Sequence, residues 1–223
     1  MFLMKNTIPK GFLHLKKNII NSLTLTTKQN KISFILKMVL ASLICSFALI
    51  GDSTPGVLGS ILISPLIGSG IGVIIAIITK NLFGFFNSWM FLLIGIVIMF
   101  VTGAFIGWFY RKDKLSYEMK RHSSKKIAWA NLFSSVIVGI AMAFFILSNN
   151  NSILLGAGTA LAVSVVPYCV NSGILLTKNI DKVKKKTLIK NNLNIACLHI
   201  IGILISCFLI FFLTLHKKID ISI

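Results

Sequence analysis

The stretch "GSILISPLIGSG", residues 59–70, decides the fold, because it is an apolar run that carries its own interruption. Pro65 stands in its middle, directly after Ser64, and Ser69 follows four residues later. Proline removes a backbone hydrogen bond from a helix interior, and in lipid the freed groups must find partners or line a polar cavity. The stretch is therefore typical of a broken or kinked helix in a membrane.

The amino-acid composition also indicates that the chain is surrounded by lipid. The chain has 223 residues, of which 56% are hydrophobic and 13% are charged, with a mean hydropathy of +0.89. A soluble domain has about 25% charged residues, because its surface must be hydrated. No strand-like alternation is long enough for a barrel, and helices are the other way to satisfy backbone groups in lipid. We expect an all-α, polytopic transmembrane helical bundle.

Six apolar segments divide the chain, and a helix needs about 20 apolar residues to cross the bilayer core. The first segment is the shortest and contains Lys37, whose side chain can reach the nearer surface. We expect five or six membrane segments within a transmembrane domain at 34–215, preceded by a basic tail or surface helix at 1–33 and followed by a short tail at 216–223. The segments are 34–50, 55–79, 89–110, 127–147, 152–177 and 194–215.

The net charge of +18 comes from Lys and Arg that lie mainly between the apolar segments. Such loops stay in the cytoplasm and face anionic lipids. The expected partner is therefore a bilayer with anionic headgroups, and a homo-oligomer is possible. Nucleic acid is not expected, because no aromatic residues interleave with the basic runs.

The charges conflict with a simple six-span topology. Residues 1–33 carry six Lys, whereas 111–126 and 178–193 together carry thirteen Lys and Arg, and six full spans place the first group opposite the other two. A re-entrant hairpin at 55–79, broken at Pro65, places all three in the cytoplasm, together with the N-terminus. The alternative is that 55–79 is a proline-kinked span.

The two halves of the chain follow one plan. "VLGSILISPLIGSGI" (57–71) and "LLGAGTALAVSVVPYCVNSGI" (154–174) share a Leu-Gly-small opening, a Ser shortly before Pro, and a later Ser-Gly. Paired interrupted helices in corresponding positions indicate a transporter site, whereas small residues and proline also serve close packing and kinks. The candidate substrate or ion path consists of Ser64, Pro65, Gly68, Ser69, Ser164, Pro167, Asn171 and Ser172.

These stretches resemble a family of uncharacterised hydrophobic-domain membrane proteins, domain of unknown function 389. One signature corresponds to "ASLICSFALIGDSTPGVLGSILISPLIGSGIG" (41–72), and the second to "GTALAVSVVPYCVNSGILL" (158–176) followed by "NNLNIACLHIIGILI" (191–205). The family usually has a second proline where Ser69 stands, and a Pro-Pro pair where this chain has Pro167-Tyr168. The resemblance implies a fold and a membrane location, but no particular chemistry.

Few other residues carry chemistry. Asp52 is expected in an exposed turn or as a helix cap, and His199 as a buried, hydrogen-bonded histidine on a different helix face from Cys197. No catalytic, metal or nucleotide motif occurs, so neither an enzyme nor a cofactor is expected. The leading hypothesis is transport or conduction of a small solute or ion, and the alternative is a non-transporting scaffold or assembly subunit.

Overall fold

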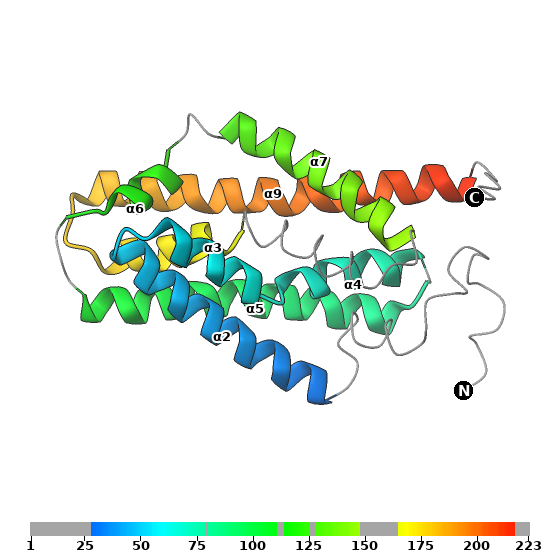
Figure 1. Cartoon of the computed structure of the whole chain (residues 1–223), viewed down its shortest axis with the longest axis horizontal. Coiled ribbons are helices and arrows are strands. Elements are labelled where there is room, and N and C mark those ends of the chain that lie inside the picture. Colours follow the sequence, from blue (N-terminus) through cyan, green and yellow to red (C-terminus); the bar gives the residue numbers. More distant parts are fainter. Residues whose placement is uncertain (1–27, 79, 111–113, 125–127, 148–164, 217–223) are drawn as a thin grey trace.

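The computed structural model describes residues 28–78, 80–110, 114–124, 128–147 and 165–216, and in these ranges it contains eight helices and no strand (Figure 1). The all-α prediction is confirmed for this part of the chain. Residues 1–27 and 217–223, and with them most of both predicted tails, lie outside it. The helices are α2 (Lys28–Ile50), α3 (Thr54–Ile63), α4 (Leu66–Ile78), α5 (Leu82–Phe109), α6 (Tyr117–His122), α7 (Ala128–Leu147), the helix Val165–Thr177, and α9 (Lys182–His216).

Several helices begin before the apolar segments that predict them. α5 begins at Leu82 because the Asn81 side chain accepts a hydrogen bond from the backbone N–H of Gly84 at 3.0 Å. α9 begins at Lys182 because Asp181 accepts from the N–H of Lys184 at 3.0 Å. Side-chain caps satisfy the first N–H groups of a helix, so polar residues extend these helices beyond their apolar part.

The predicted helix break at Pro65 is present, and the bend between the two helices is far from a reversal. α3 ends at Ile63, and Ser64 is extended with a ψ of 123°, as residues before proline prefer. α4 then begins at Leu66. The stretches 54–63 and 68–77 meet at 41°, whereas a hairpin needs a reversal close to 180°. The two helices therefore continue in broadly the same direction.

The helices pack both on their neighbours in the sequence and on helices further along the chain. α2 packs on α3 and α5, α4 packs on α5, and α7 packs on α9. α5 and α9 run along the long axis (Figure 1). The short α6 lies near the end of α5 and the beginning of α9, and we name this region the α6 end.

Glycines allow two close helix contacts. A Cβ at Gly173 would lie 2.7 Å from the backbone nitrogen of Ala104, and one at Gly103 would overlap the Val170 carbonyl. These contacts hold the helix Val165–Thr177 against α5. A Cβ at Gly139 would lie 3.0 Å from the Cα of Ile203, which brings α7 equally close to α9. Small residues at such contacts let helix backbones approach.

Three helices in the described ranges are long and apolar enough to cross a membrane, namely α2, α5 and most of α9, and the α3–α4 pair is a fourth if it is one bent span. α7 and the helix Val165–Thr177 contain shorter apolar stretches. The outer surface carries many exposed large apolar side chains, among them Phe83, Phe86 and Phe109 at 62–69% exposure. These features suggest a membrane-embedded protein. Five or six segments and the internal repeat stay predictions.

Candidate functional site

The first group of predicted site residues lies at the α3–α4 break. The Ser64 hydroxyl is buried, donates to the sulfur of Met38 at 3.5 Å and accepts from the N–H of Leu66 at 3.4 Å. The buried Ser69 hydroxyl donates to the Leu66 carbonyl at 2.6 Å. No atom outside its own helix backbone and chain neighbours lies within 4 Å of a Cβ built at Gly68. Both hydroxyls are thus engaged in local contacts beside Pro65.

The second group lies on the helix Val165–Thr177. Pro167 is the third described residue of this helix. The Ser172 hydroxyl donates to the Tyr168 carbonyl at 2.8 Å. Ser164 lies outside the described residues. Ser172 and Asn171 donate hydrogen bonds to their own helix and to α6, respectively, whereas Ser64 donates to α2 and Ser69 donates within α4.

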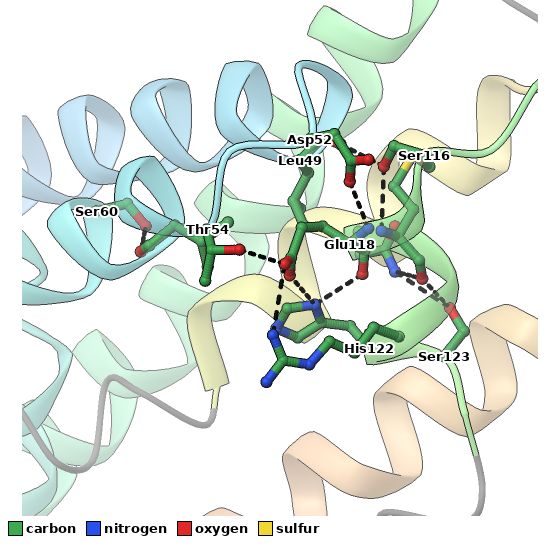
Figure 2. A network of polar contacts seen from close by, with 12 residues as sticks. Leu49, Asp52, Thr54, Ser60, Ser116, Glu118, His122 and Ser123 are labelled. Carbon is green, nitrogen blue, oxygen red and sulfur yellow. Dashed lines mark hydrogen bonds and ion pairs between the residues drawn. The ribbon is translucent and has the colours of Figure 1, made fainter.

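A second polar site, which the sequence did not reveal, surrounds Glu118 on α6 (Figure 2). Glu118 is 2% exposed, and its carboxylate accepts from the Thr54 hydroxyl at 2.6 Å and from the Arg121 guanidinium at 3.4 Å. Asp52 accepts from the backbone N–H of Glu118 at 2.8 Å, and the Ser116 hydroxyl donates to the Leu49 carbonyl. We name Asp52, Thr54, Ser116, Glu118 and His122 the α6 cluster.

The α6 cluster fastens α6 to the turn between α2 and α3. Asp52 lies in an exposed turn with a φ of 59° and also caps α6, so both roles expected for it are confirmed. α6 itself has a signal that a sequence analysis can use: Ser116 at its N-cap, Glu118 in its first turn and three basic residues in its last turn. Acidic groups near the N-terminus and basic groups near the C-terminus of a helix interact favourably with the helix dipole.

His122 completes the cluster on its inner side. Its Nδ1 lies 2.8 Å from the Glu118 carbonyl oxygen and 3.6 Å from the carboxylate. Burial lowers the pKa of the imidazole below its ordinary value of 6.5, and the contacts with Glu118 act in the opposite direction. The His122 ring meets the Tyr168 ring edge-on at 5.3 Å between centroids. His122 therefore links the α6 cluster to the helix Val165–Thr177.

A third polar region lies between the helix Val165–Thr177 and α9. The Asn171 amide donates to the Met119 carbonyl at 3.0 Å and to the Ser123 hydroxyl at 3.1 Å, and Asn191 donates to the Ser123 carbonyl at 3.4 Å. The Tyr168 ring stacks on the His199 ring at 6.2 Å. We name Tyr168, Asn171, Asn192 and His199 the α9 seam.

The α9 seam contains polar atoms without hydrogen-bond partners. Asn171 and Asn192 are 0% exposed and His199 is 2% exposed. Within the part of the chain that the structure describes, Asn171 Oδ1, both polar atoms of the Asn192 side chain and both ring nitrogens of His199 lack a hydrogen-bond partner. His199 is buried as expected, but the expected hydrogen bond is absent: the ring stacks on Tyr168, and no donor or acceptor of the described residues bonds to its nitrogens. Cys197 is exposed, on a different face from His199, as expected.

The described residues contain no group of three or more His, Cys, Asp or Glu side chains that could hold a metal ion. One buried cation, Lys178, also lies near the site. Lys178, which is 1% exposed, donates to the Tyr110 carbonyl at 2.8 Å, where α5 ends. A cation is favourable at the C-terminal end of a helix.

Together, these features define a protein whose described residues are helical, with long apolar helices, an apolar surface, a polar cluster around the buried Glu118 and a buried polar seam beside α9. The model of a family described as Domain of unknown function (DUF389) matches residues 61–212, and the chain belongs to this family. The family assignment confirms the resemblance noted in the sequence. The comparisons with curated proteins and with solved structures found no match.

Proposed function

We propose that the protein is a multi-pass membrane protein that transports or conducts a small solute or ion through its helical bundle. The α9 seam carries this proposal, because polar atoms without partners are expensive in a low-dielectric interior and mark sites that hold something else. Ionisable and amide side chains inside membrane helices face bundle interiors or pathways in proteins that move solutes.

The dimensions of α5 support the membrane location. Trp89 and Trp108 are both exposed and stand 19 positions apart, which corresponds to about 28 Å along a helix. The hydrocarbon core of a bilayer is about 30 Å thick, and Trp residues gather at its two surfaces. The exposed apolar side chains of α5 between them then face lipid.

Charge supports an orientation with the α6 end in the cytoplasm. This end carries an excess of basic side chains, which stay inside and attract anionic headgroups. The exposed members are Lys114, Lys120, Arg121, Lys182, Lys184, Lys186 and Lys190. The anionic lipid surface expected from the sequence is the partner that we propose for them.

The α6 cluster also bears on the topology at Pro65. Thr54 and Glu118 are in contact, so the turn 51–54 and the loop 111–126 lie on one side of the membrane. When α5 is a full span, the α3–α4 pair must also cross, which supports the kinked span over the hairpin. An N-terminus in the cytoplasm then requires the opposite orientation, with thirteen basic residues outside.

Labelling of single cysteines tests this topology. In a background without native cysteines, Gly51→Cys and Lys120→Cys, both at exposed positions, should react with an impermeant maleimide from the same side. The hairpin requires them to react from opposite sides. Lys80→Cys should react from the other side than Lys120→Cys.

One observation favours the scaffold alternative. Ser64 and Ser69 beside Pro65 make local hydrogen bonds, which is what packing residues at a kink do. A scaffold has no need of unpaired polar atoms, however, so the α9 seam separates the two functions.

A paired measurement tests transport against the scaffold. Full-length protein is reconstituted into vesicles, and fluxes of water, neutral solutes and monovalent ions are compared with those of protein-free vesicles. Asn171→Ala should reduce the protein-dependent flux by more than the loss of folded protein, measured from the melting temperature, can explain. Protein-free rates for every probe would contradict transport and leave the scaffold.

A further inference from the structure

The α9 seam lies where the helix Val165–Thr177 and α9 approach each other. Asn171 and Asn191 both donate hydrogen bonds to Ser123, and Tyr168 stacks on His199. The two helices are therefore antiparallel. Asn192 and His199 are seven positions apart on α9, which places them on one face. Asn192 and His199 thus share one face of α9, with Tyr168 against His199, while Asn171 and Asn191 meet at Ser123 beside the end of α6.

The unpaired atoms are balanced between donors and acceptors. The Asn192 amide has two N–H donors and a carbonyl acceptor, a neutral imidazole has one donor and one acceptor, and Asn171 adds a carbonyl oxygen. A partner that fits all of them must itself both donate and accept hydrogen bonds.

We propose that the α9 seam binds an uncharged hydrogen-bonding molecule, either water or a small neutral solute with N–H or O–H groups. This inference rests on the proposed transport function and assigns its substrate class. Asn192 and His199 bind the molecule, and Asn171 accepts from it at the α6 end.

An ion fits these unpaired polar groups poorly. A bare cation would use the acceptors and leave the amide N–H groups of Asn192 unpaired, and an anion would leave the carbonyl oxygens unpaired. The charged groups near this end contact each other or backbone: Glu118 contacts Arg121 and His122, and Lys178 donates to the end of α5. The seam itself offers no charge of opposite sign to an ion.

The Tyr168 ring adds an apolar wall beside these groups. It lies between the His122 ring and the His199 ring, within 5.3 and 6.2 Å of their centroids. A bound molecule would therefore meet an aromatic ring beside the polar groups, a combination that is common in small-molecule sites.

The test uses full-length protein in vesicles and three probes: water, by osmotic shrinkage in stopped-flow light scattering; urea, by reswelling; and potassium, by a pH-independent flux assay. The variants are Asn192→Leu and His199→Phe. The matched control is Asn194→Leu, the same change two residues along α9 at an exposed position.

We expect protein-dependent permeability to water or urea, its loss in Asn192→Leu and in His199→Phe, and its retention in Asn194→Leu, without potassium flux. Loss of water permeability alone identifies water, and loss of urea permeability as well identifies a neutral solute path. Potassium flux that Asn192→Leu abolishes would overturn the substrate class and leave transport standing. Permeability that survives both variants would overturn the site. Circular dichroism and melting temperature confirm that each variant is folded.

Discussion

The α6 cluster and the α9 seam lie next to each other and differ in how their buried polar groups are engaged. In the α6 cluster, Glu118 has partners from its own helix and from the start of α3, and Asp52 caps its backbone. In the α9 seam, Asn192 and His199 are as deeply buried as Glu118, yet their side-chain polar atoms have no hydrogen-bond partner among the described residues. Even in the α6 cluster, Glu118 Oε2 has no hydrogen bond among the described residues and contacts only His122, at 3.6 Å. The difference teaches that a buried polar group of this protein attaches helices in one region, whereas the buried polar groups of the other region lack hydrogen-bond partners among the described residues.

This contrast has a thermodynamic consequence. Removing one partner of a satisfied buried group destabilises a protein, because the other partner loses its bond, whereas replacing an unsatisfied group by an apolar one removes a penalty. Substitutions in the two regions should therefore change stability in opposite directions.

The largest effect is expected at Glu118. Glu118→Ala leaves the Thr54 hydroxyl and the inner side of His122 without the carboxylate, so we expect a loss of about 2 kcal/mol in the free energy of unfolding. Unfolding in mixed micelles measures it. Lys120→Ala, at an exposed position on the same helix, should change stability by less than about 0.5 kcal/mol. Equal effects of the two changes would show that α6 is not fastened through the carboxylate.

A smaller effect of opposite sign is expected at Asn192. Asn192→Leu replaces a buried amide without partners by an apolar group of similar size, so stability should stay unchanged or rise by about 1 kcal/mol. The same micelle assay detects it, with Asn194→Leu as the exposed reference. A clear loss of stability would mean that the amide has a structural partner, and the contrast between the regions would fail.

The smallest effect is the pH dependence that His122 adds. Its pKa in the folded protein lies below the ordinary value of 6.5 because burial disfavours the charged ring. The stability that the neutral ring contributes is therefore complete above pH 6.5 and is lost as the pH falls through the folded pKa. His122→Gln should flatten the acid side of a melting-temperature profile. An unchanged profile would indicate that the ring titrates alike in the folded and unfolded chain.

Part of the site could be predicted from the sequence, and the reason is local chemistry. Pro65 after Ser64 marks the helix break because proline cannot donate a backbone hydrogen bond. Asn171 attracts attention as an amide in an apolar segment, and it proves to be a buried contact between helices. The role of Asp52 as a cap also follows from its place in a short polar turn.

The α6 cluster could not be predicted, because its contacts join residues that are more than sixty positions apart. Thr54 and Glu118 look like ordinary polar residues of two separate loops, and only packing brings the carboxylate to the hydroxyl. His199 was misjudged for a related reason. A histidine in an apolar segment usually finds a hydrogen bond, and whether it does depends on what the facing helix presents.

The amino-acid sequence by itself determined the class of this protein: apolar segments of membrane length, basic loops between them, a broken helix at Pro65, and membership of its family. Hydrophobicity and backbone chemistry act locally along the chain, so a linear sequence carries them. The tertiary structure alone decided which polar groups are satisfied. Glu118 meets Thr54 and Asp52, while His199 stacks on Tyr168 and the Asn192 amide has no hydrogen-bond partner among the described residues, because hydrogen bonding depends on distances between segments that the sequence does not contain.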